Sequence, residues 1–231
     1  MATRPIFVPA ENGEIEVSTV MLDFEWHPGM SLKQTQKSIA SLHARARDAG
    51  VGPVLEISTK SPDPLGVSLS AFNLKIRTKK YGQVFSVEMA YQSSKIFEHG
   101  GPYKDLLSMS SQEAKRDPRL KESGRLTGFS FFNLDFPLVP RTYFYDWLYI
   151  NALRQSDEAA REVCNFEAFS DIVFNPAKSV NCQGFSAALF VALQRNDLIS
   201  EDLADPQYFL DVVGTAYKAN SNRQEAQRSF I

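Results

Sequence analysis

The stretch 69–99, LSAFNLKIRTKKYGQVFSVEMAYQSSKIFEH, places charged side chains on a short segment of predicted helix. Few residues between Ser86 and Phe97 break a helix, so we predict a helix there. At the helical repeat one side of it carries a polar stripe, made of Glu88, Gln92, Lys95 and His99, with Tyr91 beside them. The opposite side is small or apolar. Two interpretations stay open, a solvated stripe or the wall of a cleft that holds an active site.

The same stretch resembles the signature of the NADAR family of YbiA-like N-glycosidases. LSAF, at 69–72, stands where that family has a Leu-Ser-Asn-Phe-like turn, and VEMAYQSSK, at 87–95, stands where it has a Val-Glu-His-Ala-Tyr-Gln-Ala-Ala-Lys-like helix start. The spacing between the two blocks fits as well. The resemblance favours the cleft, and it implies an α+β fold of YbiA-like type: a predominantly helical single domain with a small N-terminal β element.

Length and composition agree with one domain. The chain has 231 residues, of which 43% are apolar, enough for a single well-buried core. Lys and Arg number 25 against 27 Asp and Glu, so the net charge of −2 provides no global basic field for nucleic acid. Any contact with DNA must therefore be local. We expect one domain over 1–218, with an N-terminal extension of about 1–56 outside the usual family core, and a flexible tail over 219–231.

The two cysteines and the chain start bear on location and cofactors. Cys164 and Cys182 have neither CxxC spacing nor a nearby histidine cluster, so we predict reduced thiols, no metal site and no cofactor. The opening MATRPIFVPAENGE lacks the apolar core of a secretory signal, which predicts a cytoplasmic protein. The longest apolar runs are too short to cross a bilayer, so no membrane partner is expected.

The remaining elements are predicted from the alternation of apolar and polar residues and from the residues that end or break helices. Residues 5–8 and 14–26 read as a strand pair, and a helix follows that Ser31 caps and Gly50 closes. A strand over 54–58 leads into the loop TKSPDPLG at 59–66. A hairpin with its turn near 80–82 carries basic side chains that face either solvent or phosphates: Lys75, Arg77, Lys79 and Lys80. Pro137 and Pro140 exclude a helix before Thr142, and another helix runs from about Cys182 to Arg195, with Asn181 as its cap.

Four further segments resemble parts of the NADAR pattern. Ala114–Lys115 and Gly124–Arg125 are similar to an Ala-Lys and a Gly-Arg of the family, but a longer insertion separates them, which leaves the roles of Lys115 and Arg125 open. Trp147 resembles the family's helical tryptophan. An indole there either packs in the core or stacks on a flat ring of the ligand. Asp171 matches the aspartate of an Asp-x-x-Trp-Gly motif whose Trp-Gly is here replaced by Phe174–Asn175.

Hydrolysis of an N-glycosidic bond develops positive charge on the anomeric carbon and requires a carboxylate nearby. Glu88 and Asp171 are the predicted carboxylates. Lys95, if its pKa is lowered, can attack the anomeric carbon and form a Schiff base that water resolves. The other predicted contacts bind substrate. They are Trp147 as a stacking ring, the turn residues Ser70 and Phe72, the stripe residues Tyr91 and Gln92, and Lys60, Gly101 and Asn181 on loops.

The resemblance implies two possible activities. One NADAR group hydrolyses early riboflavin-pathway intermediates, and the other removes ADP-ribose from guanine bases of DNA that a paired ADP-ribosyltransferase toxin has modified. The extended N-terminus, the STKS loop at 58–61 and the FNPxKSxNCQ segment at 174–183 resemble the antitoxin group. The expected partners are ADP-ribosylated DNA, the product ADP-ribose and the toxin as genetic partner. A flavin-pathway glycosidase and a module that only binds ADP-ribose or a nucleotide remain alternatives.

Overall fold

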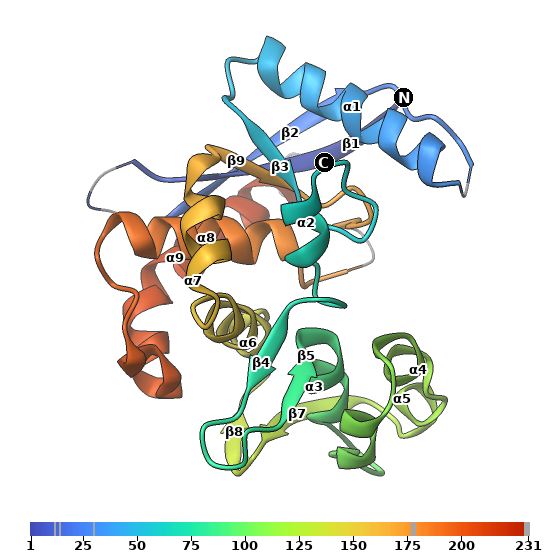
Figure 1. Cartoon of the computed structure of the whole chain (residues 1–231), viewed down its shortest axis with the longest axis vertical. Coiled ribbons are helices and arrows are strands. Elements are labelled where there is room, and N and C mark those ends of the chain that lie inside the picture. The colour runs from blue at the N-terminus through green and yellow to red at the C-terminus, as the bar shows by residue number, and fades with distance from the viewer. Residues whose placement is uncertain (12, 14, 30, 177–178, 229–231) are drawn as a thin grey trace.

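A four-stranded sheet forms one end of the molecule in the computed structural model, which describes all residues except 12, 14, 30, 177–178 and 229–231 (Figure 1). Its order is β2-β1-β9-β3, from β1 (Ala2–Pro9), β2 (Val17–Phe24), β3 (Val54–Glu56) and β9 (Ala168–Ser170). β1 runs antiparallel to β2 and β9, whereas β3 is parallel to β9. The strand pair and the third strand are as predicted. The N-terminal segment is nevertheless integral to the fold, because it flanks β9 on both edges.

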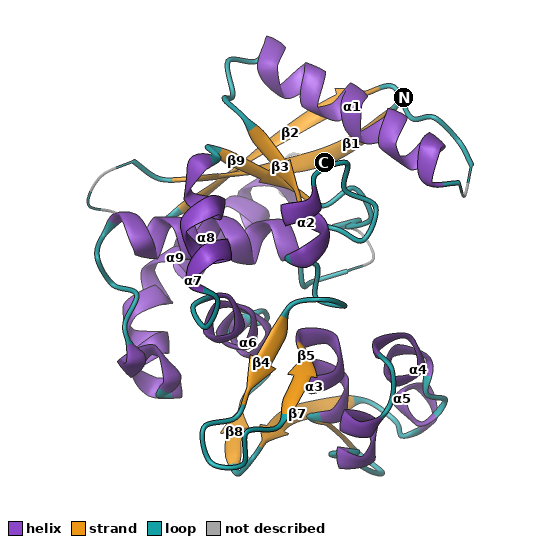
Figure 2. Ribbon diagram, viewed as in Figure 1, coloured by secondary structure: helices purple, strands orange, loops and turns teal. Residues whose placement is uncertain are grey.

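Helices cover both faces of this sheet (Figure 2). α1 (Leu32–Asp48) lies on one face, and Ser31 caps it as predicted by accepting from the Gln34 N–H. Its buried side chains, Ile39 and Leu42 among them, pack on Ile6 and Phe24 in a small second core. α8 (Gln183–Arg195) contacts β1 and β9 on the other face and belongs to the main core. The sheet therefore separates two apolar layers.

The main core is built around α6 (Tyr143–Leu153), whose residues are all buried. This helix is apolar all round because it packs against neighbours on every side, with α8 and α9 (Pro206–Arg228) among them. Pro140 precedes it, and the helix starts just after Thr142, as predicted. The shorter helices are α2 (Pro64–Ser68), α4 (Ser111–Arg116), α5 (Arg119–Glu122) and α7 (Asp157–Glu162), with 3-10 turns at Lys104–Ser108, Val163–Asn165 and Glu201–Ala204. The fold class is α+β.

Two small sheets carry the segment around the predicted stripe. β4 (Lys75–Arg77) and β5 (Val84–Ser86) form the predicted hairpin. It leads directly into α3 (Val87–Ser93). A second sheet has the order β6-β7-β8, from β6 (Lys95–Phe97), β7 (Leu126–Phe131) and β8 (Leu134–Phe136). The helix predicted to reach Phe97 is therefore wrong beyond Ser93. Pairing of Lys95 with Phe129 outweighs the local helix preference and turns the chain into a strand.

Three other predictions concern the end of α9, the start of α8 and the two cysteines. α9 continues to Arg228, since no proline or glycine follows Gly214 and Ala, Gln, Glu and Arg favour helix. The flexibility expected over 219–231 stays a prediction, and 229–231 lie outside the described residues. The predicted start of α8 is shifted by one residue: Cys182 is its N-cap, and the Asn181 side chain contacts another element instead. Cys164 and Cys182 are free thiols, as predicted. Among the described residues, no helix combines the length and apolar character needed to cross a membrane.

Candidate active site

The turn at 69–72 is the hub from which the candidate site is built. The Leu69 carbonyl accepts from the Tyr149 hydroxyl of α6 at 2.8 Å. The Ala71 N–H donates to the Gln183 side chain of α8 at 2.6 Å, and the Ala71 carbonyl accepts from the Glu88 N–H of α3 at 2.8 Å. The Phe72 carbonyl accepts from the Ser111 hydroxyl, next to the start of α4. One short turn is therefore hydrogen-bonded to four helices: α3, α4, α6 and α8.

Glu88 lies in the first turn of α3 and is 5% exposed. Its Oε1 accepts from the Gln92 side-chain amide at 2.8 Å and lies 3.5 Å from the Lys115 ammonium. A carboxylate only accepts hydrogen bonds, which orients the Gln92 amide with its NH₂ toward Glu88. Lys115 itself is half exposed and reaches the carboxylate from α4. The polar stripe thus begins in a partly enclosed position rather than in bulk solvent.

Lys95 joins this group from the first position of β6. Its ammonium lies 4.7 Å from the ring centroid of Tyr91, so it faces the aromatic ring of the preceding helix. Burial lowers the pKa of Lys95 to about 8; the charge of Glu88 opposes that shift and the charge of Lys115 adds to it. Lys115 lies in turn 4.8 Å from the ring centroid of Phe72. Two lysines, each over an aromatic ring, therefore flank Glu88.

Tyr91 and Asn181 form the next contact. The Asn181 amide donates to the Tyr91 hydroxyl at 2.6 Å, and the Tyr91 ring packs edge-on against Tyr145 at 5.3 Å between centroids. Burial raises the pKa of Tyr91 to about 12, so its phenol keeps its proton at neutral pH. The pKa of Tyr145 is raised well above its usual value by burial and by the charges of Glu88 and Asp171. Tyr145 therefore lies within electrostatic reach of both predicted carboxylates.

Asp171, directly after β9, is 5% exposed and its oxygens already have protein donors. Oδ1 accepts from the N–H groups of Val173 and Phe174, each at 3.2 Å, and Oδ2 accepts from the Gln183 amide at 3.0 Å. Because Gln183 also binds the Ala71 N–H, one glutamine connects Asp171 to the hub turn. Asp171 therefore reaches the Glu88 group through Gln183 and Tyr145.

Glu56 in β3 is a buried carboxyl that the sequence reasoning missed. It accepts from the Ser170 hydroxyl at 2.5 Å and from the Ile172 N–H at 3.0 Å, and it is 1% exposed. Burial, followed by the charge of Asp171, raises its pKa to about 7. The signal that could have found it is a single charged residue inside the apolar strand VLEIS. His43 extends this network by a 2.8 Å contact with Ser170.

Several predicted residues lie elsewhere. His99 is exposed and does not extend the stripe. Trp147 is 4% exposed, and its ring neighbours are Phe131, Phe136 and Phe144. The predicted stacking ring is therefore not beside the Glu88 group, because the indole packs in an aromatic core on the side of α6 away from Tyr145. The reason is periodicity: positions 145 and 147 are about 200° apart on a helix.

The loop residues have structural contacts of their own. The Ser70 hydroxyl donates to the Val67 carbonyl, and the Lys60 N–H donates to the Ser58 hydroxyl. Gly101 has φ +87°, and a Cβ there would lie 2.2 Å from the Lys95 carbonyl oxygen. Only glycine permits that approach, so Gly101 supports the strand that carries Lys95. Of the two uncertain cations, Lys115 joins the site, whereas Arg125 is 89% exposed and pairs with Glu98.

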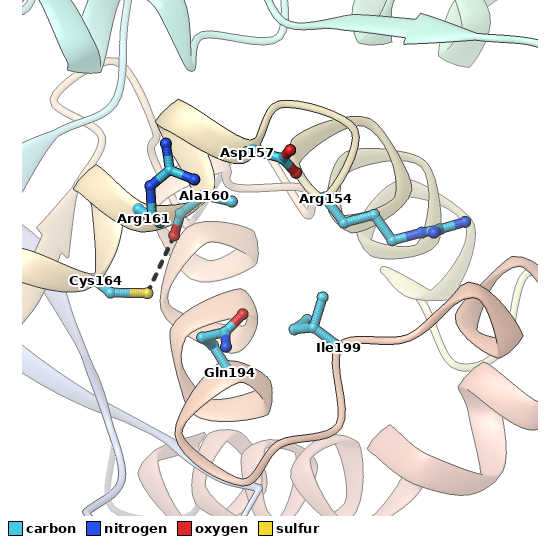
Figure 3. A pocket seen from close by; sticks show the side chains of 7 residues that line it. All are labelled: Arg154, Asp157, Ala160, Arg161, Cys164, Gln194 and Ile199. Atoms are coloured by element: carbon cyan, nitrogen blue, oxygen red, sulfur yellow. Dashed lines mark hydrogen bonds between the residues drawn. The ribbon is translucent and has the colours of Figure 1, made fainter.

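A hollow of about 360 Å³ between α6, α7 and α8 has a different lining (Figure 3): Arg154, Asp157, Ala160, Arg161, Cys164, Gln194 and Ile199. None of the predicted site residues is among them. Figure 3 also shows the Cys164 thiol donating to the Ala160 carbonyl, at 3.2 Å. Since this hollow contains no carboxylate–lysine group of the kind around Glu88, the candidate active site is the Glu88 group.

Comparison with known families places the chain beside one group of antitoxins. A family model described as DarT1-associated NADAR antitoxin matches residues 2–223. The matched range includes the N-terminal segment of about 1–56 that was expected to lie outside the family core, and it extends well into α9. Comparison with curated proteins finds no match.

Proposed function

The chain belongs to the family of DarT1-associated NADAR antitoxins, and from that premise we propose that it hydrolyses the N-glycosidic bond between ADP-ribose and guanine in modified DNA. The observation that carries the proposal is the group formed by Glu88, Lys95 and Lys115. A buried carboxylate beside a lysine of lowered pKa is a combination suited to this bond cleavage. The reaction would restore the unmodified base and release ADP-ribose.

Glu88 is the proposed catalytic carboxylate. As the bond from the anomeric carbon to the base nitrogen breaks, the electron pair leaves with the base, which takes up a proton from the solvent. The ribose carbon becomes positively charged, and the Glu88 carboxylate stabilises that charge. In the direct route, water adds to the same carbon and loses its proton to Glu88. Lys115 and the Gln92 amide hold the carboxylate in place.

Lys95 supports a second, covalent route. With a pKa of about 8, roughly one lysine in ten carries a neutral amine at pH 7, against fewer than one in a thousand for an ordinary lysine. The amine forms a bond to the anomeric carbon as the base leaves, and opening of the ribose ring gives an imine with the proton on the former ring oxygen. Water then adds to the imine carbon, the amine leaves, and ADP-ribose is released.

The remaining residues position these groups. For the Tyr91 hydroxyl, which accepts from Asn181, we propose the role of a donor to the ligand, and Phe72 provides a ring beneath Lys115. For Asp171 we propose a positioning role, since its oxygens bind two backbone N–H groups and Gln183, which holds the hub turn. Lys60, Ser70 and Gly101 remain proposed contacts for the phosphates and riboses of the ligand.

The direct test uses an oligonucleotide that carries ADP-ribose on guanine. Wild-type protein is expected to release ADP-ribose, which chromatography and mass spectrometry detect. The Glu88→Gln variant is expected to bind the oligonucleotide but to release no ADP-ribose from it. A wild-type protein that binds the oligonucleotide and leaves it intact would show a binding module instead. Hydrolysis of the N-glycosidic bond in riboflavin-pathway intermediates, with the oligonucleotide left intact, would assign the flavin-related activity.

The covalent route has its own test. Borohydride reduces an imine to a stable amine, so a trapped intermediate adds the mass of ADP-ribose less one oxygen atom to the peptide that contains Lys95. Lys95→Met is the matched variant, and it should give no adduct. Full turnover by Lys95→Met would exclude this route and leave the direct attack of water at Glu88.

A further inference from the structure

The β4–β5 hairpin is an exposed cationic element that leads directly into the candidate site. Residues 64–87 contain four cations and neither Asp nor Glu. All four side chains are exposed: Lys75, Arg77, Lys79 and Lys80. Strand alternation turns Ile76 into the core and leaves Lys75 and Arg77 on the outer side. In a chain of net charge −2, the hairpin is thus a local positive surface.

The tip of the hairpin also presents an aromatic ring. Tyr81 is 64% exposed, and the Lys80 ammonium lies 5.1 Å from its ring centroid. An exposed ring beside a cation is the combination that binds single-stranded nucleic acid, because unpaired bases stack on the ring and phosphates contact the cation. Lys79 differs, since its ammonium lies 2.7 Å from the Glu201 carboxylate, so we leave it out of the proposed surface.

The base of the hairpin is joined to the catalytic group. Lys75 pairs with Ser86 across the two strands, and Ser86 is the N-cap of α3. The Ser86 hydroxyl also lies 2.7 Å from that of Ser111, close to the start of the helix that carries Lys115. The strand that carries Lys75 and the helix that carries Lys115 therefore both contact the N-cap of α3. At about 3.3 Å per residue, the hairpin extends roughly 15 Å from there to its tip.

We propose that the β4–β5 hairpin binds an unpaired polynucleotide strand next to the modified base. Lys75 and Lys80 contact the phosphates, and Tyr81 stacks on one base. The inference rests on the proposed function, because it takes the modified base to be held at Glu88. It adds that the substrate is a single strand of several nucleotides rather than a free nucleotide or an intact duplex.

Binding is tested first, without turnover. Anisotropy of a labelled, unmodified 12-nucleotide oligothymidine is followed with Glu88→Gln protein across a salt series. Adding Lys75→Ser and Lys80→Ser should weaken binding about ten-fold and reduce the slope of log affinity against log salt by about 1.4, since each phosphate contact on a single strand contributes about 0.7. Adding Tyr81→Ser should weaken binding by about ten-fold and leave the slope unchanged.

A charge-matched control comes from the opposite end of the molecule (Figure 1). Lys33 and Lys37 of α1 are exposed, so Lys33→Ser with Lys37→Ser removes the same charge without touching the hairpin. This control should bind the oligonucleotide as its parent does. Equal losses in the control and hairpin variants, or no loss in either, would overturn the proposal. The proposal would also be overturned if the protein bound a duplex as tightly as the single strand and if Tyr81→Ser left binding of the single strand unchanged.

Turnover separates this inference from the proposed function. ADP-ribosylated guanosine monophosphate and an ADP-ribosylated 12-mer are compared as substrates of the otherwise wild-type protein. The hairpin variants should lose at least ten-fold more kcat/KM on the 12-mer than on the mononucleotide. The same loss on both would refute the hairpin's role while the glycosidase stands, whereas a wild type inactive on both would refute the glycosidase. Loss of binding to the toxin protein, with oligonucleotide binding intact, would assign the hairpin to a protein partner and overturn the proposal.

Discussion

Glu88 and Glu56 are both buried glutamates, but their surroundings differ. Glu56 is enclosed by protein donors and lies beside a second carboxyl, Asp171. Glu88 accepts from one amide and pairs with Lys115, a cation that is half exposed and comes from a short helix. A carboxyl whose acceptor positions are filled by the fold serves the fold, whereas one paired with a half-exposed cation can exchange that cation for a ligand. The contrast separates a structural network from the proposed reactive group.

The largest expected effect is on the rate of ADP-ribose release. Glu88→Gln keeps the shape of the side chain but removes the charge that would stabilise the transition state, so turnover should fall on the order of 10³-fold with the melting temperature little changed. Glu56→Gln should keep turnover within about ten-fold of wild type. Steady-state rates and thermal melts on the same preparations check both. An equal loss in the two variants would break the contrast.

Stability against pH should distinguish the two glutamates next. Below the ordinary pKa of 4.5 Glu56 is protonated in both the folded and unfolded states, and between there and about 7 only the folded state keeps the proton. The stabilisation is therefore present below pH 4.5 and lost as the pH rises through about 7, on the order of 3 kcal/mol. Glu56→Gln should flatten this decline in denaturant titrations at pH 5 and pH 8. A wild-type decline that survives in the variant would assign it to other groups.

The pH dependence of turnover tests the cations around Glu88. If the covalent route operates, the rate should rise with pH through about 8, as Lys95 loses its proton. Lys115→Met removes a neighbouring positive charge, which raises the pKa of Lys95, so the midpoint should move upward and the rate at pH 7.5 should fall about two- to three-fold. Lys121→Met, an exposed charge on α5, is the control. An unshifted midpoint would show that Lys115 does not tune Lys95.

The smallest effect is expected at Trp147. Its indole packs on Phe136 and Phe144 inside the aromatic core, so Trp147→Phe should lower the free energy of unfolding by about 1 kcal/mol and leave turnover within a few-fold. Chemical denaturation and initial rates measure the two quantities. A large loss of turnover at unchanged stability would restore the predicted stacking of this ring on the ligand.

Local patterns predicted the elements whose determinants are local. The Ser31 cap, the β4–β5 turn and the prolines before α6 each act within a few residues. The end of α3 could not be predicted in the same way, because the chain leaves the helix to pair with β7, more than thirty residues later. Boundaries set by such distant pairing are not encoded in the periodicity of the segment itself.

The candidate site shows the same division. Glu88 and Gln92 are four residues apart on one helix, so their contact follows from the helical repeat. Lys95 was placed on the same stripe and does face the Glu88 group, but from a strand. Lys115, Tyr145 and Gln183 reach the site from separate elements, and no spacing in the sequence brings them together. The resemblance to the family located the helix, and tertiary packing supplied its partners.

The position of β9 has a consequence for synthesis of the protein. β1 pairs with β9 through Ile6–Ser170 and Phe7–Phe169, so the first strand of the chain waits for a partner made more than 160 residues later. At the usual 5–20 residues per second, that wait lasts about 10–30 s, during which one edge of β1 has no neighbour in the sheet. Asn181 and Gln183, which complete the site, leave the ribosome later still. A newly made molecule can therefore complete this sheet and its candidate site only after nearly all of the chain has been translated.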